Sequence, residues 1–124
     1  MAMAFTTDNK FGYLANFDSA EIAKIDIERD SVILKIKNIP SPRGITVTPD
    51  NKYVLVTKVV DHTLTIMEIS TDTVIKTLYG LRMPTWVLTT KDGKYAIVSN
   101  QGAASLAIID LVTLEITKSV PTAE

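Results

Sequence analysis

The chain has 124 residues, of which 46% are apolar and 22% charged, as expected for a single globular domain with a buried core. Thirteen basic and fourteen acidic residues give a formal charge of −1, which argues against nucleic-acid binding because that function needs a basic face. With no cysteine and one histidine, the chain can form neither disulfides nor cysteine-ligated zinc sites. No apolar run reaches the roughly 18 residues of a membrane span, and no signal peptide is visible. We therefore expect no metal, no cofactor, no nucleic-acid partner and no membrane span.

A gapless repeat organises the chain, and its period of about 42 residues is in the range of stacked structural repeats. Matching turns read Asp-Asn-Lys at 8–10 and 50–52 and Asp-Gly-Lys at 92–94. Their middle residues are of the types that tolerate a positive φ, so we predict tight turns between strands at these three places.

Each repeat predicts four short strands, since Val, Ile and Thr dominate the segments between turns. The second strand of the middle repeat is a continuous apolar run, which indicates burial on both faces. The fourth strand alternates and carries lysines, a common feature of exposed sheet edges. No helical period appears, so no helix longer than two turns is expected. The predicted strands cover residues 2–6, 11–16, 22–26 and 31–36, then 44–48, 53–57, 64–69 and 73–78, then 86–90, 95–100, 106–110 and 115–120.

Four antiparallel strands in each repeat, with burial decreasing from first to last, are typical of a β-propeller blade. We predict an all-β fold made of three such blades, at about 1–42, 43–84 and 85–124, in one propeller segment over residues 1–124. The segment would be half of a six-bladed ring or a piece of a larger propeller.

The repeat resembles the YVTN family of β-propeller repeats, which occurs in bacterial and archaeal surface proteins. The resemblance rests on PDNKYVLVT at 49–57, DGKYAIVSN at 92–100 and GLRMP at 80–84. It covers the whole chain and implies the propeller fold. It also implies a cell-surface or secreted location.

Three blades leave two apolar faces open, because propellers close with about 4–8 blades. The arc can be completed by a second copy, by further blades of a longer protein, or by a different cap. We predict a homodimer that closes a six-bladed ring. The residues expected on the two open faces are Met3, Phe5 and Tyr13 at one end and Val87, Ile97 and Ile108 at the other.

The candidate ligand-binding residues fall on loops at one edge of the predicted blades. Asp61 and His62 form a hairpin tip, which is either a base or metal ligand or, as we prefer for a lone histidine, a solvated turn. Arg43 enters an innermost strand, where its side chain either reaches the central channel or covers apolar surface. Trp86 is either a stacking platform at the channel mouth or a space filler. Arg82 lies on the loop before that strand.

Propeller lactonases are similar in carrying Pro-Arg-His at the place where this chain has Pro42, Arg43 and Gly44. The glycine is a departure from that motif. The recurring carboxylates Asp26, Glu68 and Asp110 lie one blade apart, so we interpret them as turn caps rather than shared calcium ligands.

Two function classes follow, and a third is weaker. The first is a non-catalytic binding or scaffold module that assembles through blade faces and presents a loop face to a protein or glycan. The alternative is a lactonase or hydrolase that uses channel residues such as Arg43 and His62. The third, a haem-carrying propeller, lacks axial ligands in this sequence. We favour the first, with no catalytic residue assigned, because no nucleophile–base pair is recognisable.

Overall fold

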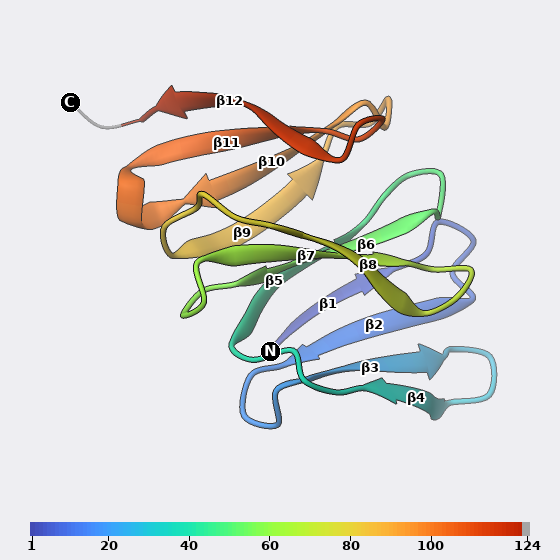
Figure 1. Ribbon diagram of the computed structural model, residues 1–124. Helices are drawn as coiled ribbons and strands as arrows, with labels where there is room; N and C mark the ends of the chain where they lie inside the picture. The colour runs from blue at the N-terminus through green and yellow to red at the C-terminus, as the bar shows by residue number, and fades with distance from the viewer. Residues whose placement is uncertain (123–124) are drawn as a thin grey trace.

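The computed structural model describes residues 1–122, which form twelve strands in three four-stranded antiparallel sheets (Figure 1). The predicted all-β propeller segment is confirmed. The final two residues of the third predicted blade lie outside the described residues. The strands are β1 (Ala2–Phe5), β2 (Phe11–Asn16), β3 (Glu21–Asp26), β4 (Ser31–Ile36), β5 (Pro42–Val47), β6 (Tyr53–Lys58), β7 (Thr63–Glu68), β8 (Thr73–Leu78), β9 (Pro84–Thr89), β10 (Tyr95–Asn100), β11 (Ser105–Asp110) and β12 (Glu115–Pro121).

Each sheet is one blade with its strands in chain order, β1 to β4, β5 to β8 and β9 to β12. The first strands line up on the inside, where β5 lies between β1 and β9. Each outermost pairing contains a bulge, a device that twists an edge away from pairing with another sheet. One single-turn 3-10 helix, Gln101–Ala103, interrupts the all-β pattern. Within residues 1–122 no helix is long and apolar enough to cross a membrane.

The turn between the first two strands is held by the same side-chain hydrogen bonds in every blade. In the middle blade Thr48 Oγ1 donates to Asp50 Oδ1 at 2.7 Å and accepts from the Tyr53 N–H at 3.0 Å. The same carboxylate accepts from the Lys52 N–H, and Asn51 has the predicted positive φ of 59°. The counterparts of Asp50 in the outer blades have a lowered pKa, chiefly because a threonine hydroxyl donates to each of them; they are Asp8 and Asp92.

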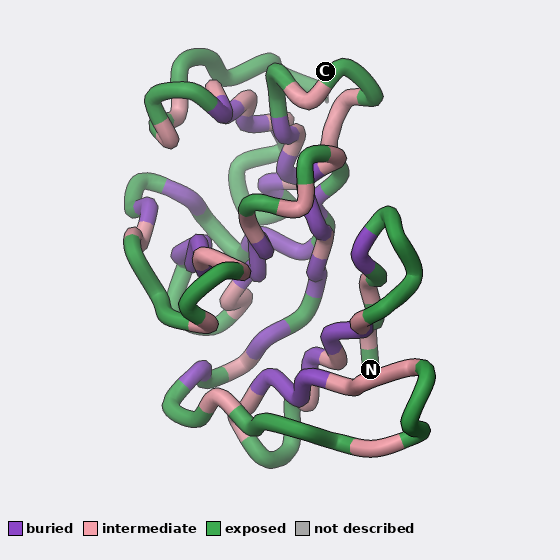
Figure 2. Tube along the Cα trace, turned by 90° about the vertical axis from the view of Figure 1, so that its right-hand side faces the viewer, coloured by how far each residue is buried: buried purple, intermediate pink, exposed green. Residues whose placement is uncertain are grey.

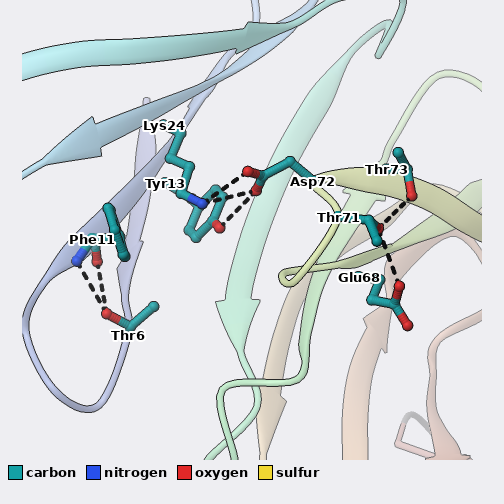
Figure 3. Close-up of polar contacts among 8 residues, drawn as sticks. All are labelled: Thr6, Phe11, Tyr13, Lys24, Glu68, Thr71, Asp72 and Thr73. Atoms are coloured by element: carbon teal, nitrogen blue, oxygen red, sulfur yellow. Dashed lines mark hydrogen bonds and ion pairs between the residues drawn. The ribbon is translucent and has the colours of Figure 1, made fainter.

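The first and second blades meet through a mixed polar and apolar junction. Tyr13 and Ile22 of the first blade pack with Ile45, Val54 and other residues of the second. Across the same junction a salt bridge joins β3 to the β7–β8 turn, as Figure 3 shows for the lysine and aspartate involved. Figure 2 shows the buried stretches in the interior of the trace and the exposed ones around its outside, which include most of β4 and β12.

The second and third blades meet through an apolar junction. Leu55 and Ile66 of the second blade pack with Val87, Val98 and other residues of the third, and Leu114 packs against this cluster. The expectation that Tyr13 and Val87 lie on the open end faces is therefore wrong, since both are buried against the middle blade. Strand alternation defines two faces, but in a stack of blades both are apolar. The alternation therefore does not say which face is open.

We expect the fold to lose stability at alkaline pH through Tyr13. Its hydroxyl donates to Asp72 Oδ1 at 3.1 Å, and burial, followed by the nearby carboxylate, raises the pKa of Tyr13 well above its ordinary value. A raised folded-state pKa stabilises the fold fully below the unfolded value of about 10, and this contribution is lost as the pH rises beyond it. Urea midpoints measured at about pH 8 and about pH 11 should show a drop.

The Tyr13→Phe variant isolates this effect, because phenylalanine cannot ionise. It should be less stable than the parent at the lower pH, where the hydrogen bond is missing, and should show a smaller drop at the higher pH. Tyr79→Phe changes an exposed tyrosine and should keep the full drop. An equal alkaline loss in Tyr13→Phe and the parent would contradict the assignment.

Candidate functional site

Two of the sequence-predicted residues, Arg43 on β5 and Trp86 on β9, come together at one end of the inner strands. They line a cavity of about 290 Å³ together with Met1, Phe17 and Pro42. The inner strands bring them together because β5 and β9 pack directly on each other.

Local backbone geometry places the residues around this cavity. Pro42 is buried at the start of β5 and follows Ser41, which has a left-handed φ of 49° and accepts a hydrogen bond from the Val59 N–H at 3.1 Å. Arg43 is thereby exposed beside the cavity. The aromatic residue at the tip of the β2–β3 turn, Phe17, is also exposed. Its role was not predicted, although an exposed aromatic residue in a loop on the predicted ligand edge was a usable signal.

The cavity combines a permanent positive charge with two aromatic surfaces. A guanidinium stays protonated at any physiological pH and can bind a carboxylate through two parallel N–H groups. Trp86 and Phe17 offer flat apolar surface for stacking, and tryptophan is 55% exposed here. Because neither a carboxylate nor an imidazole is among these five lining residues, the arrangement offers binding chemistry rather than a nucleophile and a base.

The other three candidates lie outside this cavity. His62 has a left-handed φ of 60° at its hairpin tip, and its Nδ1 accepts a hydrogen bond from the Met83 N–H at 2.9 Å. Asp61 faces Lys58, with 3.8 Å between carboxylate and ammonium. The Arg82 N–H donates to Asn100 Oδ1 at 2.6 Å, so its backbone ties the loop before β9 to the third blade's hairpin. These contacts give all three residues local structural partners.

The recurring carboxylates cap turns, as the sequence predicts. Asp26 accepts from the Arg29 N–H, Glu68 from the Thr71 hydroxyl, and Asp110 from two backbone N–H groups. Among the described residues no group of three or more histidine, aspartate or glutamate side chains is placed to hold a metal ion. Two further hollows lie on the face of the third blade that points away from the second blade, and Trp86 lines one of them as well as the cavity beside Arg43.

Three four-stranded blades around a common inner edge define the chain as part of a β-propeller. A family model described as Arylesterase matches residues 5–95, well over half of the sequence. The chain therefore belongs to the Arylesterase family. A comparison with curated proteins finds no match.

Solved structures of several propellers share this fold. Hydrazine synthase from Kuenenia stuttgartiensis is similar with a TM-score of 0.93 and 20% identity, over 99% of this chain and 36% of that one. A functionally unknown protein from Desulfotomaculum acetoxidans DSM 771 is similar with a TM-score of 0.87 and 18% identity, over 99% of this chain and 42% of that one. Dihydro-heme d1 dehydrogenase NirN in complex with DHE is similar with a TM-score of 0.81 and 16% identity, over 96% of this chain and 26% of that one. The chain thus spans less than half the length of each, and identities this low carry the fold alone.

Proposed function

We propose that the chain is a propeller binding module whose channel mouth holds a planar organic anion. The single observation that carries the proposal is the shared cavity of Arg43, Trp86 and Phe17. In this assignment the guanidinium binds a carboxylate and the aromatic rings stack on the flat remainder of the ligand. Aryl carboxylates and the acidic sugars of glycans both have this chemistry.

The module also assembles through its blade faces, with a second copy completing a six-bladed homodimeric ring. Large apolar side chains on both end faces support this proposal, among them Met3 and Phe5 on the first blade and Leu88 on the third, all more than half exposed. Soluble monomers rarely expose contiguous apolar surface of this kind. A YVTN-type repeat and a place on the cell surface belong to the same proposal.

A hydrolytic function is the second candidate, and the match to the Arylesterase family favours it. At this mouth Arg43 would bind the acyl oxygen or the carboxylate product of an ester. The acid and base would come from other blades of a complete ring, because the cavity lining supplies neither. Hydrolysis of phenyl acetate by the assembled protein, lost in Arg43→Gln, would favour this candidate over simple binding.

Benzoate is a direct probe of the binding proposal, because Trp86 is the only tryptophan in the chain and reports on the cavity by its fluorescence. Titration with benzoate should give a saturable change in this fluorescence. Arg43→Gln keeps a polar side chain but removes the charge, and should weaken binding by about tenfold or more, as expected for a charge-assisted pair.

Two controls separate recognition of charge and shape from nonspecific effects. Benzyl alcohol has the same ring without the carboxylate and should bind at least about tenfold more weakly than benzoate. Arg82→Gln makes the same change at an exposed arginine outside the cavity and should bind benzoate like the parent. An Arg43→Gln variant with unchanged benzoate affinity would overturn the proposal.

A further inference from the structure

One turn position carries a different side chain at each blade junction, and it decides the chemistry of that junction. Asp30, Asp72 and Leu114 occupy this position of the repeat between the third and fourth strands, with left-handed φ values of 52°, 53° and 57°. At the first junction Asp72 reaches back to the preceding blade, where the Lys24 ammonium lies 2.9 Å from its Oδ2 (Figure 3). At the second junction Leu114 packs against the apolar cluster that contains Ile66, the counterpart of Lys24.

The open face of the third blade presents a cation beside an apolar hollow. Ile97, Ile108 and Lys118 line a cavity of about 250 Å³ on this face. Lys118 on β12 lies beside Ile108 on β11 in the strand register. Its counterpart in the middle blade, Lys76, extends across the second junction to Glu115, with 3.6 Å between ammonium and carboxylate. By the same repeat geometry Lys118 extends toward whatever blade follows.

The open face of the first blade presents an anion in the matching place. Asp30 is exposed, and its counterpart Asp72 crosses to the preceding blade, so Asp30 extends toward whatever blade precedes. Glu115, which Lys76 meets, corresponds to Ser31, the next residue along the chain. Suppose that a copy of the first blade packs on the third blade in the way that the third packs on the second. The turn that contains Asp30 would then lie beside Lys118.

We infer that the first blade of one copy of this chain packs on the third blade of a second copy, with Asp30 of one copy paired to Lys118 of the other. Opposite charges at the two ends favour this head-to-tail contact. A contact between two third blades or between two first blades would bring like charges together. The inference rests on the ring assembly proposed above and adds the residues that select its pairing.

A second contact along the same junction fits this pairing. Between the first and second blades Thr7 and Asn51 exchange two hydrogen bonds of 2.8 Å, one of them through the Thr7 N–H. The corresponding residues at the closing junction are Lys91 and Asn9, both exposed. The amide oxygen of Asn9 can accept from the Lys91 ammonium, so the exposed polar groups on both sides find partners.

Twofold symmetry forms two such junctions at once and closes the ring. A stable interface buries about 1,600 Å² in total, so each of the two junctions needs to supply only about 800 Å². The apolar residues available for this are Met3, Phe5, Leu14 and Ile25 on the first blade and Leu88, Ile97, Leu106 and Ile108 on the third.

Charge reversal at the two ends tests the pairing by sedimentation equilibrium. Lys118→Glu faces a native Asp30 at both junctions of its dimer, and Asp30→Lys faces a native Lys118, so each variant alone should dimerise at least about tenfold more weakly than the parent. An equimolar mixture of the two variants should recover the dimer. In that heterodimer one junction has the native pair and the other has the same pair with its charges exchanged.

Lys94→Glu is the matched control, since it makes the same change in charge at an exposed turn lysine that does not line the hollow. It should dimerise like the parent. A parent chain that stays monomeric at micromolar concentration would overturn both the ring and the pairing. A parent dimer unaffected by the two reversals, or no recovery in the mixture, would overturn the pairing and leave the ring standing. Benzoate binding at the channel mouth is measured separately and tests neither.

Discussion

Replacing Asp72 by leucine should destabilise the protein by about 3 kcal/mol, because it leaves the Lys24 ammonium buried without its carboxylate. The Lys24 side chain is 9% exposed and that of Asp72 22%. The Lys24 ammonium lies 4.5 Å from the centre of the Phe11 ring and 5.5 Å from that of Tyr13. These ring contacts replace part of the lost attraction, which places the expected cost at the lower end of the range for buried pairs.

The second junction of the same chain shows how the loss should be recovered. There an isoleucine and a leucine occupy the two positions, and Leu114 adopts the left-handed backbone that the turn requires. The double variant Lys24→Ile with Asp72→Leu therefore copies a junction that already packs in this protein. It should recover part of the loss, since well-packed apolar groups can replace a buried ion pair at little cost. It should still lie about 1 kcal/mol or more below the parent, because the buried Tyr13 hydroxyl loses its acceptor.

Urea unfolding at one protein concentration measures both effects. Asp72→Asn is a useful intermediate, because its amide oxygen still accepts from Tyr13 while the charge is gone. Its free energy of unfolding should lie between those of the parent and Asp72→Leu. If Asp72→Leu and the double variant Lys24→Ile with Asp72→Leu are equally unstable, the salt bridge is not the source of the loss. The left-handed backbone at position 72 would then be the more important constraint.

The repeat made most of the fold predictable, and the turns show why. Asn9, Asn51 and Gly93 are residue types that accept a positive φ, so the sequence revealed three hairpins and their common register. Ala20 and Ala104 adopt left-handed backbone at another repeated turn, although alanine gives no local signal for it. There the rest of the hairpin imposes the conformation.

The junctions were less predictable than the blades. Lys24 and Asp72 belong to different blades, and neither has a charged counterpart at the junction of the second and third blades. Their pairing therefore could not be predicted from the repeat. The candidate site was predicted in part. Trp86 was found because it departs from a repeat that has a small residue at this position elsewhere, and Arg43 because it enters an innermost strand near the channel. His62 was singled out by residue type and lies at a structural turn.

Adding a single methyl group at Gly44 should cost about 1–3 kcal/mol, because the inner strands of the second and third blades leave no room for it. A Cβ on this residue would lie 2.5 Å from the Thr85 carbonyl oxygen and 2.9 Å from the Trp86 Cα, both backbone atoms of β9. A hydroxyl on the neighbouring strand closes the same space. Thr57 Oγ1 accepts from the Gly44 N–H at 2.8 Å and donates to the Thr85 carbonyl at 3.0 Å.

The Gly44→Ala variant should therefore push β9 away and lengthen the Thr57 bridge between the blades. Gly12→Ala is the matched control in another strand, where the closest neighbour of the added methyl is the ring of Phe5 at 3.1 Å and the nearest backbone atom lies at 3.8 Å. That ring is about half exposed and can turn aside. We expect Gly12→Ala to cost less than about 1 kcal/mol in urea unfolding. Because Trp86 is attached to the displaced strand, Gly44→Ala should also shift the tryptophan emission and weaken benzoate binding, while Gly12→Ala changes neither. Equal stability of the two variants would show that the second and third blades are not held as closely at β5 and β9 as the structure places them.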